Sequence, residues 1–327
     1  LKSLDDKLYI DYSREDFFYG ESDNYKKKPY SPIFPIGFDQ SADVGASIMG
    51  FPWFEREILG LALKAIKNEN LGQRDTPDLL SVGLSAMDWI IHDYGPFSQE
   101  VMDALVKVDG YLMKFIEEVD LMVGLENVLF VLTADHGGLP LPEYLTKNGV
   151  SAGRINSDHL KEALTWIDQE VEDLYTDKLY YRSGSNFYLN HSTIKNNNIN
   201  ISELYNLVEK YLLKVEGINS VIQKETILAN RNKDDKIENR IKNMIHPENS
   251  PDFFVILKEG FLYRSPFGTS HGTPYDYDTH VPLIFSRAKF KKNIDDSKKE
   301  TVDIAPTIAN YLGVEIPDYC DGKPIIF

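Results

Sequence analysis

The chain has 327 residues, which is enough for one large α/β domain or two ordinary domains with a substantial buried core. Its 42% hydrophobic and 26% charged residues are typical of a globular protein, and no apolar run is long enough to span a bilayer. The net charge of −16 argues against nucleic acid as the main partner, because a phosphate backbone repels an acidic surface.

The first 50 residues are rich in aromatic side chains and are interrupted by Pro29, Pro32 and Pro35. They predict an irregular connector and carry no signal-peptide pattern. From residue 51 to residue 68, apolar side chains recur at helical spacing, and Gly72 is expected to end this helix.

Two short apolar runs, LLSVGL at residues 79–84 and VLFVLT at residues 128–133, have the composition of buried parallel strands. Between them, apolar residues step by threes and fours over residues 98–124, which predicts a helix. The order strand, helix, strand predicts a βαβ unit with parallel strands. The polar ends of these strands, with Asp88 and Asp135, would then meet at one edge of the sheet.

The pattern changes after Pro142, and residues 156–244 lack the apolar strands found on either side. This region is expected to be an inserted cap, whereas core strands are predicted at residues 253–257 and 281–285. The expected fold class is α/β, as a three-layer α/β/α sandwich with a mostly parallel central sheet and an inserted cap. The expected parts are a connector at 1–50, a metal-binding core at 51–155 and 245–327, and the cap at 156–244.

Asp135 and His136 directly follow the strand at residues 128–133, in the run VLTADHGG. Ligands of open α/β sheets bind at the carboxyl ends of the strands, and an adjacent carboxylate and imidazole suit a transition metal. Alternatively, the Asp caps the next turn and the His is incidental, and the dipeptide alone does not decide. Because Cys320 is the only cysteine, any metal must be held by His and carboxylate.

Two further clusters contain histidine. Asp88 and His92 stand four residues apart in MDWIIHDYGP, so both share one face if the segment is helical. Taken alone, this motif is better explained by an Asp at a helix start and an ordinary surface His. His271, in SHGTPYDYDTHVP, lies on a Gly/Pro-rich loop, and His280 lies nearer the next strand. Three such clusters beside core strands or glycine turns together favour a metal site.

These motifs, with the helix containing VDGYL and the closing TVDIAPTIANYLGV, resemble the alkaline phosphatase superfamily. The resemblance is to single-chain bacterial phosphatases in its phosphodiesterase/nucleotide-pyrophosphatase-like branch, and it covers most of residues 51–153 and 251–327. It implies two zinc ions. The residues that match the ligands of one zinc are Asp88, His92 and His271, and those that match two ligands of the second are Asp135 and His136.

Two details qualify the histidine loop. The resemblance favours His271 over His280, because the ligand in this superfamily is the His of a His-Gly pair. Asp276 and Asp278 are candidates to orient His271, although capping the loop is the better explanation of each.

The residues that this superfamily uses upstream of the D-x-x-x-H motif cannot be identified here. They are a metal-binding Asp, a Thr or Ser nucleophile, an Asn and a Lys/Arg pair. Residues 7–11, KLYID, imitate a strand that ends in Asp, but Ser41 and Ser47 lack the surroundings of the nucleophile. The chain is therefore expected to be the carboxyl-terminal part of a longer enzyme and to be inactive alone.

The resemblance implies a zinc-dependent phosphomonoesterase that works through a phospho-Thr or phospho-Ser intermediate on a small phosphate ester. It also implies a periplasmic or secreted location and an amino-terminal part of the same protein as partner. Two alternatives stay open. One is a phosphodiesterase or sulfatase of the same superfamily, and the other is a metal-binding protein without catalysis.

Overall fold

The computed structural model describes residues 48–229, 235–264 and 266–326. The expected connector at residues 1–50 lies almost wholly outside these ranges. The described chain divides into two compact units. The first contains Ala86–Leu105 and His136–His280, and the second contains Pro52–Ser85, Val106–Asp135 and Val281–Phe327.

The second unit is built mainly from helices. Helix α3 (Trp53–Glu69) confirms the predicted helix at residues 51–68, although it ends at Asn70, which adopts a left-handed conformation, rather than at Gly72. Helix α13 (Ile304–Leu312) ends at Gly313, whose φ of 66° is a conformation that glycine adopts without strain. Single 3-10 turns, η2 (Leu125–Asn127) and η3 (Thr301–Asp303), precede the strand β1 and the helix α13.

The strands of the second unit are β1 (Phe130–Thr133) and β8 (Leu283–Ser286), which pair antiparallel. Residues 79–84 are not a strand, so the predicted parallel βαβ pairing is wrong for the described part of the chain. The reason is that a strand requires a hydrogen-bonded neighbour, and none of the described residues pairs with this run. Leu79 and Leu80 of this run are consequently exposed, with Leu79 at 74%.

Helix α5 (Gln99–Val123) confirms the long helix predicted between these runs. The Ser98 hydroxyl accepts a hydrogen bond from the backbone N–H of Val101, which is the contact expected of an N-cap. Helix α4 (Ala86–Tyr94) precedes it. In the first unit, Ile90 of α4 packs against Val101 and Ala104 of α5, and this contact fixes the helix that carries Asp88 and His92.

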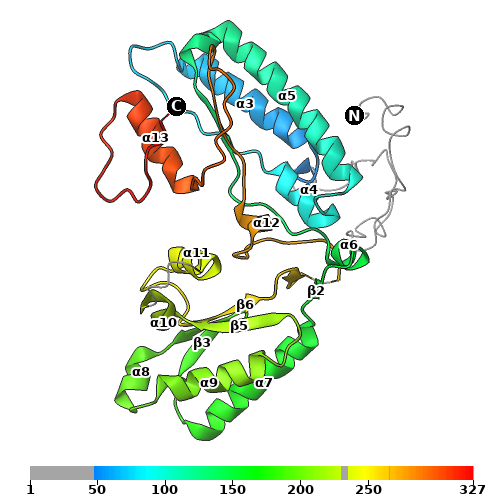
Figure 1. Cartoon of the computed structure of the whole chain (residues 1–327), viewed down its shortest axis with the longest axis vertical. Coiled ribbons are helices and arrows are strands. Elements are labelled where there is room, and N and C mark those ends of the chain that lie inside the picture. Colours follow the sequence, from blue (N-terminus) through cyan, green and yellow to red (C-terminus); the bar gives the residue numbers. More distant parts are fainter. Residues whose placement is uncertain (1–47, 230–234, 265, 327) are drawn as a thin grey trace. The chain divides into compact units, whose positions relative to one another are not determined.

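The first unit also contains an antiparallel four-stranded sheet in the order β3-β4-β6-β5. Figure 1 shows α7 and α9 side by side along it. The strands are β3 (Tyr180–Ser183), β4 (Asn186–Leu189), β5 (Ile218–Gln223) and β6 (Phe253–Leu257). The helices of this region are α7 (Ser157–Leu174), α8 (His191–Asn196), α9 (Ile201–Leu212), α10 (Lys224–Ala229) and α11 (Lys236–Met244).

Strand β6 lies inside this sheet, so the subdomain extends beyond the expected cap boundary at residue 244. Its side chains alternate between two cores. Phe253, Val255 and Leu257 pack with α7 and α9, whereas Phe254 and Ile256 pack with α10 and α11. Burial on both faces explains why β6 has the continuous apolar pattern that the sequence analysis assigned to the main core. The three-part division of the chain stays a prediction.

Short elements complete the first unit. Strands β2 (Gly153–Arg154) and β7 (Phe261–Leu262) pair in parallel, helix α6 (Pro142–Lys147) precedes β2, and helix α12 (Asp276–Thr279) follows the His271 loop. None of the helices in the described ranges combines the length and the apolar character needed to cross a membrane.

Candidate metal centre

Helix α4 supplies the first two side chains of the site. Asp88 lies in its first turn and His92 in its last, four residues later, so both side chains share one face of the helix. The Nε2 atom of His92 lies 3.6 Å from the Oδ2 atom of Asp88. A carboxylate and an imidazole are therefore presented together, and both are only partly buried.

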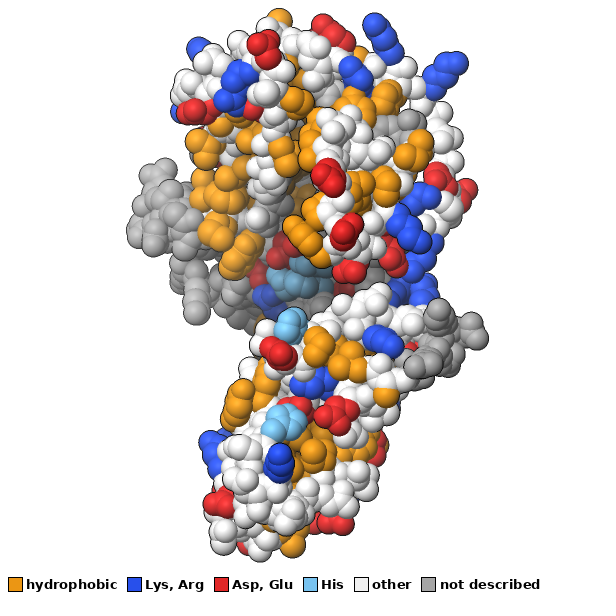
Figure 2. All heavy atoms as spheres, turned by 90° about the vertical axis from the view of Figure 1, so that its left-hand side faces the viewer, with side chains coloured by type: hydrophobic (Ala, Val, Ile, Leu, Met, Phe, Trp, Pro, Cys, Tyr) orange, Lys and Arg blue, Asp and Glu red, His pale blue; other side chains and the backbone are white. Residues whose placement is uncertain are grey.

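The loop before α12 brings His271 to the same place. Its Nε2 atom lies 3.2 Å from Nε2 of His92 and 3.6 Å from Oδ1 of Asp88. Potential ligand atoms of all three residues lie within 4.8 Å of one another. Two donors held roughly 2.0–2.1 Å from one tetrahedral zinc are about 3.4 Å apart, so these separations fit a single ion. Figure 2 shows His side chains gathered beside acidic ones on one face.

Thr269 fixes the orientation of His92. The Nδ1 atom of His92 donates to the backbone oxygen of Thr269 at 2.8 Å, and the backbone N–H of Thr269 donates to the His92 oxygen at 2.8 Å. A carbonyl oxygen can only accept, so the proton of the neutral ring is on Nδ1. The lone pair of Nε2 is then directed at the cluster, as a metal ligand requires.

Thr269 also joins the other loops of the site. Its side chain is fully buried, and its Oγ1 atom donates to the backbone oxygen of Leu139 at 2.6 Å. Arg264 reaches the same Thr269 backbone oxygen at 3.4 Å and forms an ion pair of 2.6 Å with Asp93, the neighbour of His92. Sequence analysis missed Thr269, Arg264 and Asp93, because their partners are distant in the chain and no local pattern marks them.

His136 borders the same cluster. Its ring stacks on that of His271 with centroids 3.4 Å apart, and its Nε2 atom lies 4.0 Å from Oδ1 of Asp88. The next residue, Gly137, donates its N–H to the backbone oxygen of Asp278 at 2.7 Å. A Cβ atom at Gly137 would lie 2.1 Å from the backbone oxygen of Tyr277, so only glycine allows this approach.

The electrostatic surroundings favour neutral imidazole at His271. Burial lowers the pKa of His271, and the adjacent His136 lowers it further, while the carboxylate of Asp88 acts in the opposite direction. A neutral ring keeps a lone pair available for a cation near neutral pH.

The remaining predicted residues are placed differently. Asp135 directly precedes His136 in the chain but falls in the second unit, so its meeting with Asp88 stays a prediction. His280 is exposed at the end of α12 and does not belong to the cluster of Asp88, His92 and His271.

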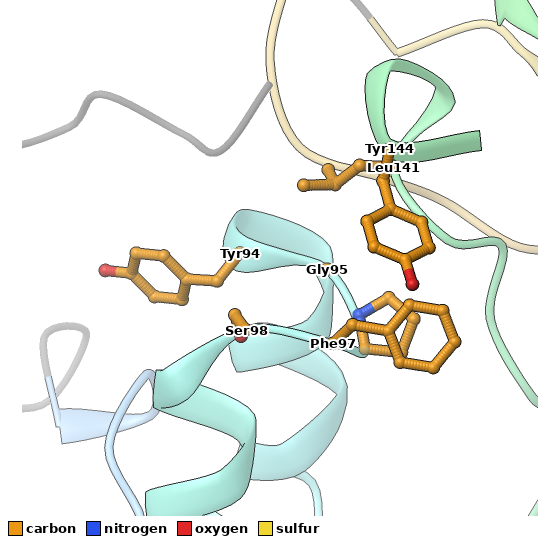
Figure 3. A pocket seen from close by; sticks show the side chains of 7 residues that line it. Tyr94, Gly95, Phe97, Ser98, Leu141 and Tyr144 are labelled. Atoms are coloured by element: carbon orange, nitrogen blue, oxygen red, sulfur yellow. The ribbon is translucent and has the colours of Figure 1, made fainter. Parts of the chain in front are cut away.

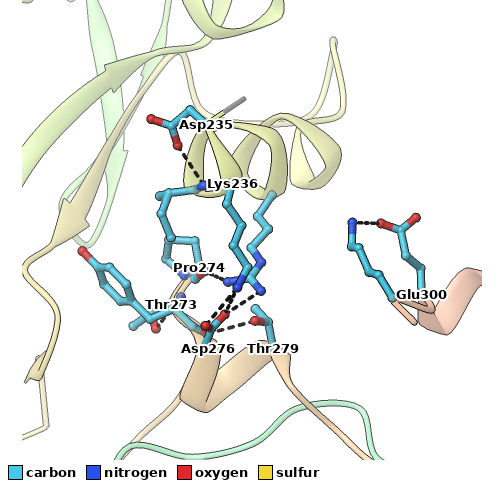
Figure 4. Close-up of polar contacts among 11 residues, drawn as sticks. Asp235, Lys236, Thr273, Pro274, Asp276, Thr279 and Glu300 are labelled. Carbon is cyan, nitrogen blue, oxygen red and sulfur yellow. Dashed lines mark hydrogen bonds and ion pairs between the residues drawn. The ribbon is translucent and has the colours of Figure 1, made fainter. Parts of the chain in front are cut away.

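Asp276 and Asp278 differ in their contacts. Asp276 is exposed and pairs with Lys236 and Arg240 of α11, and these hydrogen bonds lower the pKa of its carboxyl to about 2 (Figure 4). Asp278 is buried, and its Oδ2 atom accepts from the backbone N–H and the hydroxyl of Thr273, each at 2.7 Å. Asp276 therefore ties the loop to α11, whereas Asp278 holds the loop together from within.

A separate small cavity lies where α4 ends, lined by Tyr94, Phe97, Leu141 and Tyr144 (Figure 3). Its volume is about 10 Å³, which is the room of about one water molecule. It is too small for a phosphate ester, so the metal cluster remains the candidate site of chemistry in the described part of the chain.

Comparisons with known proteins agree with this geometry. Residues 10–281 match the family model described as type I phosphodiesterase / nucleotide pyrophosphatase. Alkaline phosphatase PafA of Elizabethkingia meningoseptica is 27% identical over 303 residues, which are 92% of this chain and 54% of that protein. Alkaline phosphatase PhoV of Synechococcus elongatus is 28% identical over 298 residues, 89% of this chain and 52% of that protein. A calcium-transporting ATPase of Myroides odoratus is 27% identical over 333 residues, 99% of this chain and 58% of that protein.

The fold agrees as well. The crystal structure of wild-type PafA superposes with a TM-score of 0.84 at 26% identity, covering 99% of this chain and 62% of that one. The expected α/β fold class is thereby confirmed. The chain spans about half the length of the curated relatives it matches. On the match over residues 10–281, the chain belongs to the type I phosphodiesterase/nucleotide pyrophosphatase family.

Proposed function

We propose that this chain carries the metal-binding part of a zinc-dependent phosphomonoesterase that acts on small phosphate esters. The observation that carries the proposal is the convergence of Asp88, His92 and His271, from two segments about 180 residues apart, at separations that suit one ion. Relatives of this chain are named alkaline phosphatases, which supports phosphate-ester hydrolysis as the reaction.

In this proposal Asp88, His92 and His271 hold one zinc ion, and Asp135 and His136 supply two ligands of a second. Bound zinc would lower the pKa of the attacking hydroxyl or water and stabilise the leaving oxygen. The protein's contribution is to hold His92 with its proton on Nδ1 and to keep His271 uncharged. A His/carboxylate ligand set leaves coordination positions open, as a catalytic zinc requires.

The attacking group is proposed to be a Thr or Ser that lies upstream of these 327 residues and forms a phosphoenzyme intermediate. Two hydroxyls near His271 are poor candidates, because Thr269 donates to Leu139 and Thr273 donates to Asp278. An amino-terminal part of the same protein is proposed as the partner that supplies this attacking group. A periplasmic or secreted location is proposed from the family resemblance.

Phosphodiester hydrolysis is the second candidate, and the description of the matched family favours it. A monoester carries one more ionisable oxygen than a diester, so the groups that contact the phosphate decide between the two. The ratio of turnover on an aryl phosphate monoester to turnover on the matching diester distinguishes the candidates directly.

The test uses the intact protein, loaded with zinc, as wild type, His92→Ala, His271→Ala and His280→Ala. Removing one member of a catalytic unit typically costs orders of magnitude, so the first two variants should lose at least about 100-fold in kcat/KM and lose bound zinc by mass spectrometry. His280→Ala is the matched control, an exposed histidine nine residues from His271. Equal zinc content and activity in His271→Ala and His280→Ala would refute the proposal.

The chain alone provides a further check. Residues 1–327, expressed without any other segment and given zinc, should hydrolyse an aryl phosphate only in traces, because the proposed nucleophile is not among them. Substantial hydrolysis that disappears in His92→Ala would contradict the upstream nucleophile, and Ser41, Ser47 and Ser85 would then be the residues to substitute.

A further inference from the structure

The imidazoles of His92, His271 and the bordering His136 differ in the hydrogen bonds made by their Nδ1 atoms. The Nδ1 atom of His92 donates to the backbone oxygen of Thr269, and Nδ1 of His136 donates to the backbone oxygen of Gly137, each at 2.8 Å. His271 presents Nε2 to the cluster, at 3.2 Å from His92. Its Nδ1 atom donates to no acceptor among the described residues.

Within the described ranges, Asp278 has a buried acceptor atom that lacks a donor, whereas Nδ1 of His271 is a donor that lacks an acceptor. Asp278 is 3% exposed, and only Oδ2 of its carboxylate is engaged, by the two donors of Thr273. Its Oδ1 atom is buried without any hydrogen-bond donor in the described part of the chain. A buried carboxylate oxygen without a donor costs free energy, so a donor is expected in the functional state.

Asp278 is also placed where both histidine loops meet. Thr273, whose N–H and hydroxyl it accepts, is two residues after His271. Its backbone oxygen accepts the N–H of Gly137, which follows His136.

We propose that Asp278 is a positioning residue of the metal site, whose Oδ1 atom accepts the Nδ1 proton of His271 when Nε2 of His271 binds the metal. This rests on the proposed metal site and adds a residue to it. A metal-binding histidine generally gives its second N–H to a carboxylate or carbonyl, which fixes the ring and makes the binding nitrogen more basic. His92 has such a partner in Thr269, and Asp278 would give His271 an ionised one.

A purely structural role makes a different prediction. If Asp278 only closes the loop through Thr273, removing the Thr273 hydroxyl should weaken the metal site much as removing the charge of Asp278 does. If Asp278 positions His271, the two substitutions should separate, because Thr273→Val leaves Oδ1 untouched.

The test titrates the intact protein with Zn²⁺ against a competing chelator, as wild type, Asp278→Asn, Thr273→Val and His271→Ala. Asp278→Asn should bind zinc about 10- to 100-fold more weakly, whereas Thr273→Val should change the affinity by less than about threefold. Affinity of Asp278→Asn within about threefold of the wild type, or equal losses in Asp278→Asn and Thr273→Val, would overturn the proposal.

His271→Ala separates the two levels of the argument. If it binds zinc as the wild type does, His271 is no ligand, and both the proposed site and the role of Asp278 fall. If it loses zinc while Asp278→Asn keeps full affinity, the metal site stands and only the role of Asp278 falls.

An NMR measurement of the His271 tautomer can be made on the wild type and so does not depend on whether a variant folds. In the zinc-loaded protein with ¹⁵N-labelled histidine, NMR should find a slowly exchanging proton on Nδ1 of His271. The Nε2 atom of the same ring should carry no proton, because it binds the metal. A His271 ring with its proton on Nε2 and the metal on Nδ1 would overturn the proposal. Where Asp278→Asn does fold, this proton signal should shift in that variant and stay in place in Thr273→Val.

Discussion

Replacing Thr269 with valine tests whether the loops of the metal site are held by one buried hydroxyl. The substitution keeps the shape of the side chain and removes the 2.6 Å hydrogen bond from Oγ1 to the backbone oxygen of Leu139. Both residues are at most 1% exposed, so water cannot replace the lost donor. An acceptor left unsatisfied in the interior costs about 1–3 kcal/mol, and we expect the free energy of unfolding to fall by that amount.

Urea unfolding followed by circular dichroism measures this loss. The matched control is Thr279→Val, because the Thr279 hydroxyl donates to the backbone oxygen of Tyr275 at 3.0 Å at an exposed position. Water can satisfy that oxygen, so the control should change the stability by less than about 0.5 kcal/mol. Equal effects of the two substitutions would refute the idea that Thr269 joins the loops through its buried hydroxyl.

Three further predictions concern other parts of the first unit. Gly137→Ala should destabilise the protein and reduce bound zinc, because its Cβ atom would lie 2.1 Å from a backbone oxygen of α12, and zinc content equal to the wild type would contradict this. The Asp276 carboxyl should titrate with a pKa of about 2, because Lys236 and a neighbouring arginine donate to it. The ionised Asp276 carboxylate therefore contributes its full stabilisation above its usual pKa of 3.8, and this stabilisation is lost as the pH falls through about 2. In Lys236→Met, NMR titration should find the pKa of Asp276 closer to 3.8. Phe253→Ala should cost about 3–5 kcal/mol in urea unfolding, because Phe253 is fully buried, whereas Tyr181→Ala, at a 58% exposed position, should cost far less.

Sequence analysis succeeded where the determining interactions are local. The helical spacing of apolar residues identified α3 and α5, and the serine before α5 is its N-cap. The D-x-x-x-H spacing placed two side chains on one face of α4, because that relation depends only on the helix period. The His-Gly pair in the next motif singled out His271, which the structure brings to the same two side chains.

It failed where a segment depends on a distant partner. Residues 79–84 are as apolar as a buried strand, yet strand formation requires a neighbour that composition does not specify. Strand β6 has the pattern of a main-core strand because helices of the subdomain cover both its faces. Thr269 was missed because its acceptor, Leu139, lies 130 residues away. The sequence analysis preferred a loop cap over a partner of His271 as the role of Asp278, since sequence does not report that its carboxylate is buried.

Self-association in concentrated solution follows from the exposed run at residues 79–84. Leu79 and Leu80 of this run are exposed, and its backbone N–H and C=O groups pair with no strand in the described ranges. In the same unit, Leu132 of β1 and Ile284 of β8 are 45% and 50% exposed. Uncovered strand-forming segments with apolar side chains recruit strands from other molecules, which leads to aggregation. Expression of residues 1–327 alone should therefore yield inclusion bodies. A charged substitution such as Leu79→Lys should increase the soluble fraction without affecting α4 or the proposed metal ligands Asp88 and His92.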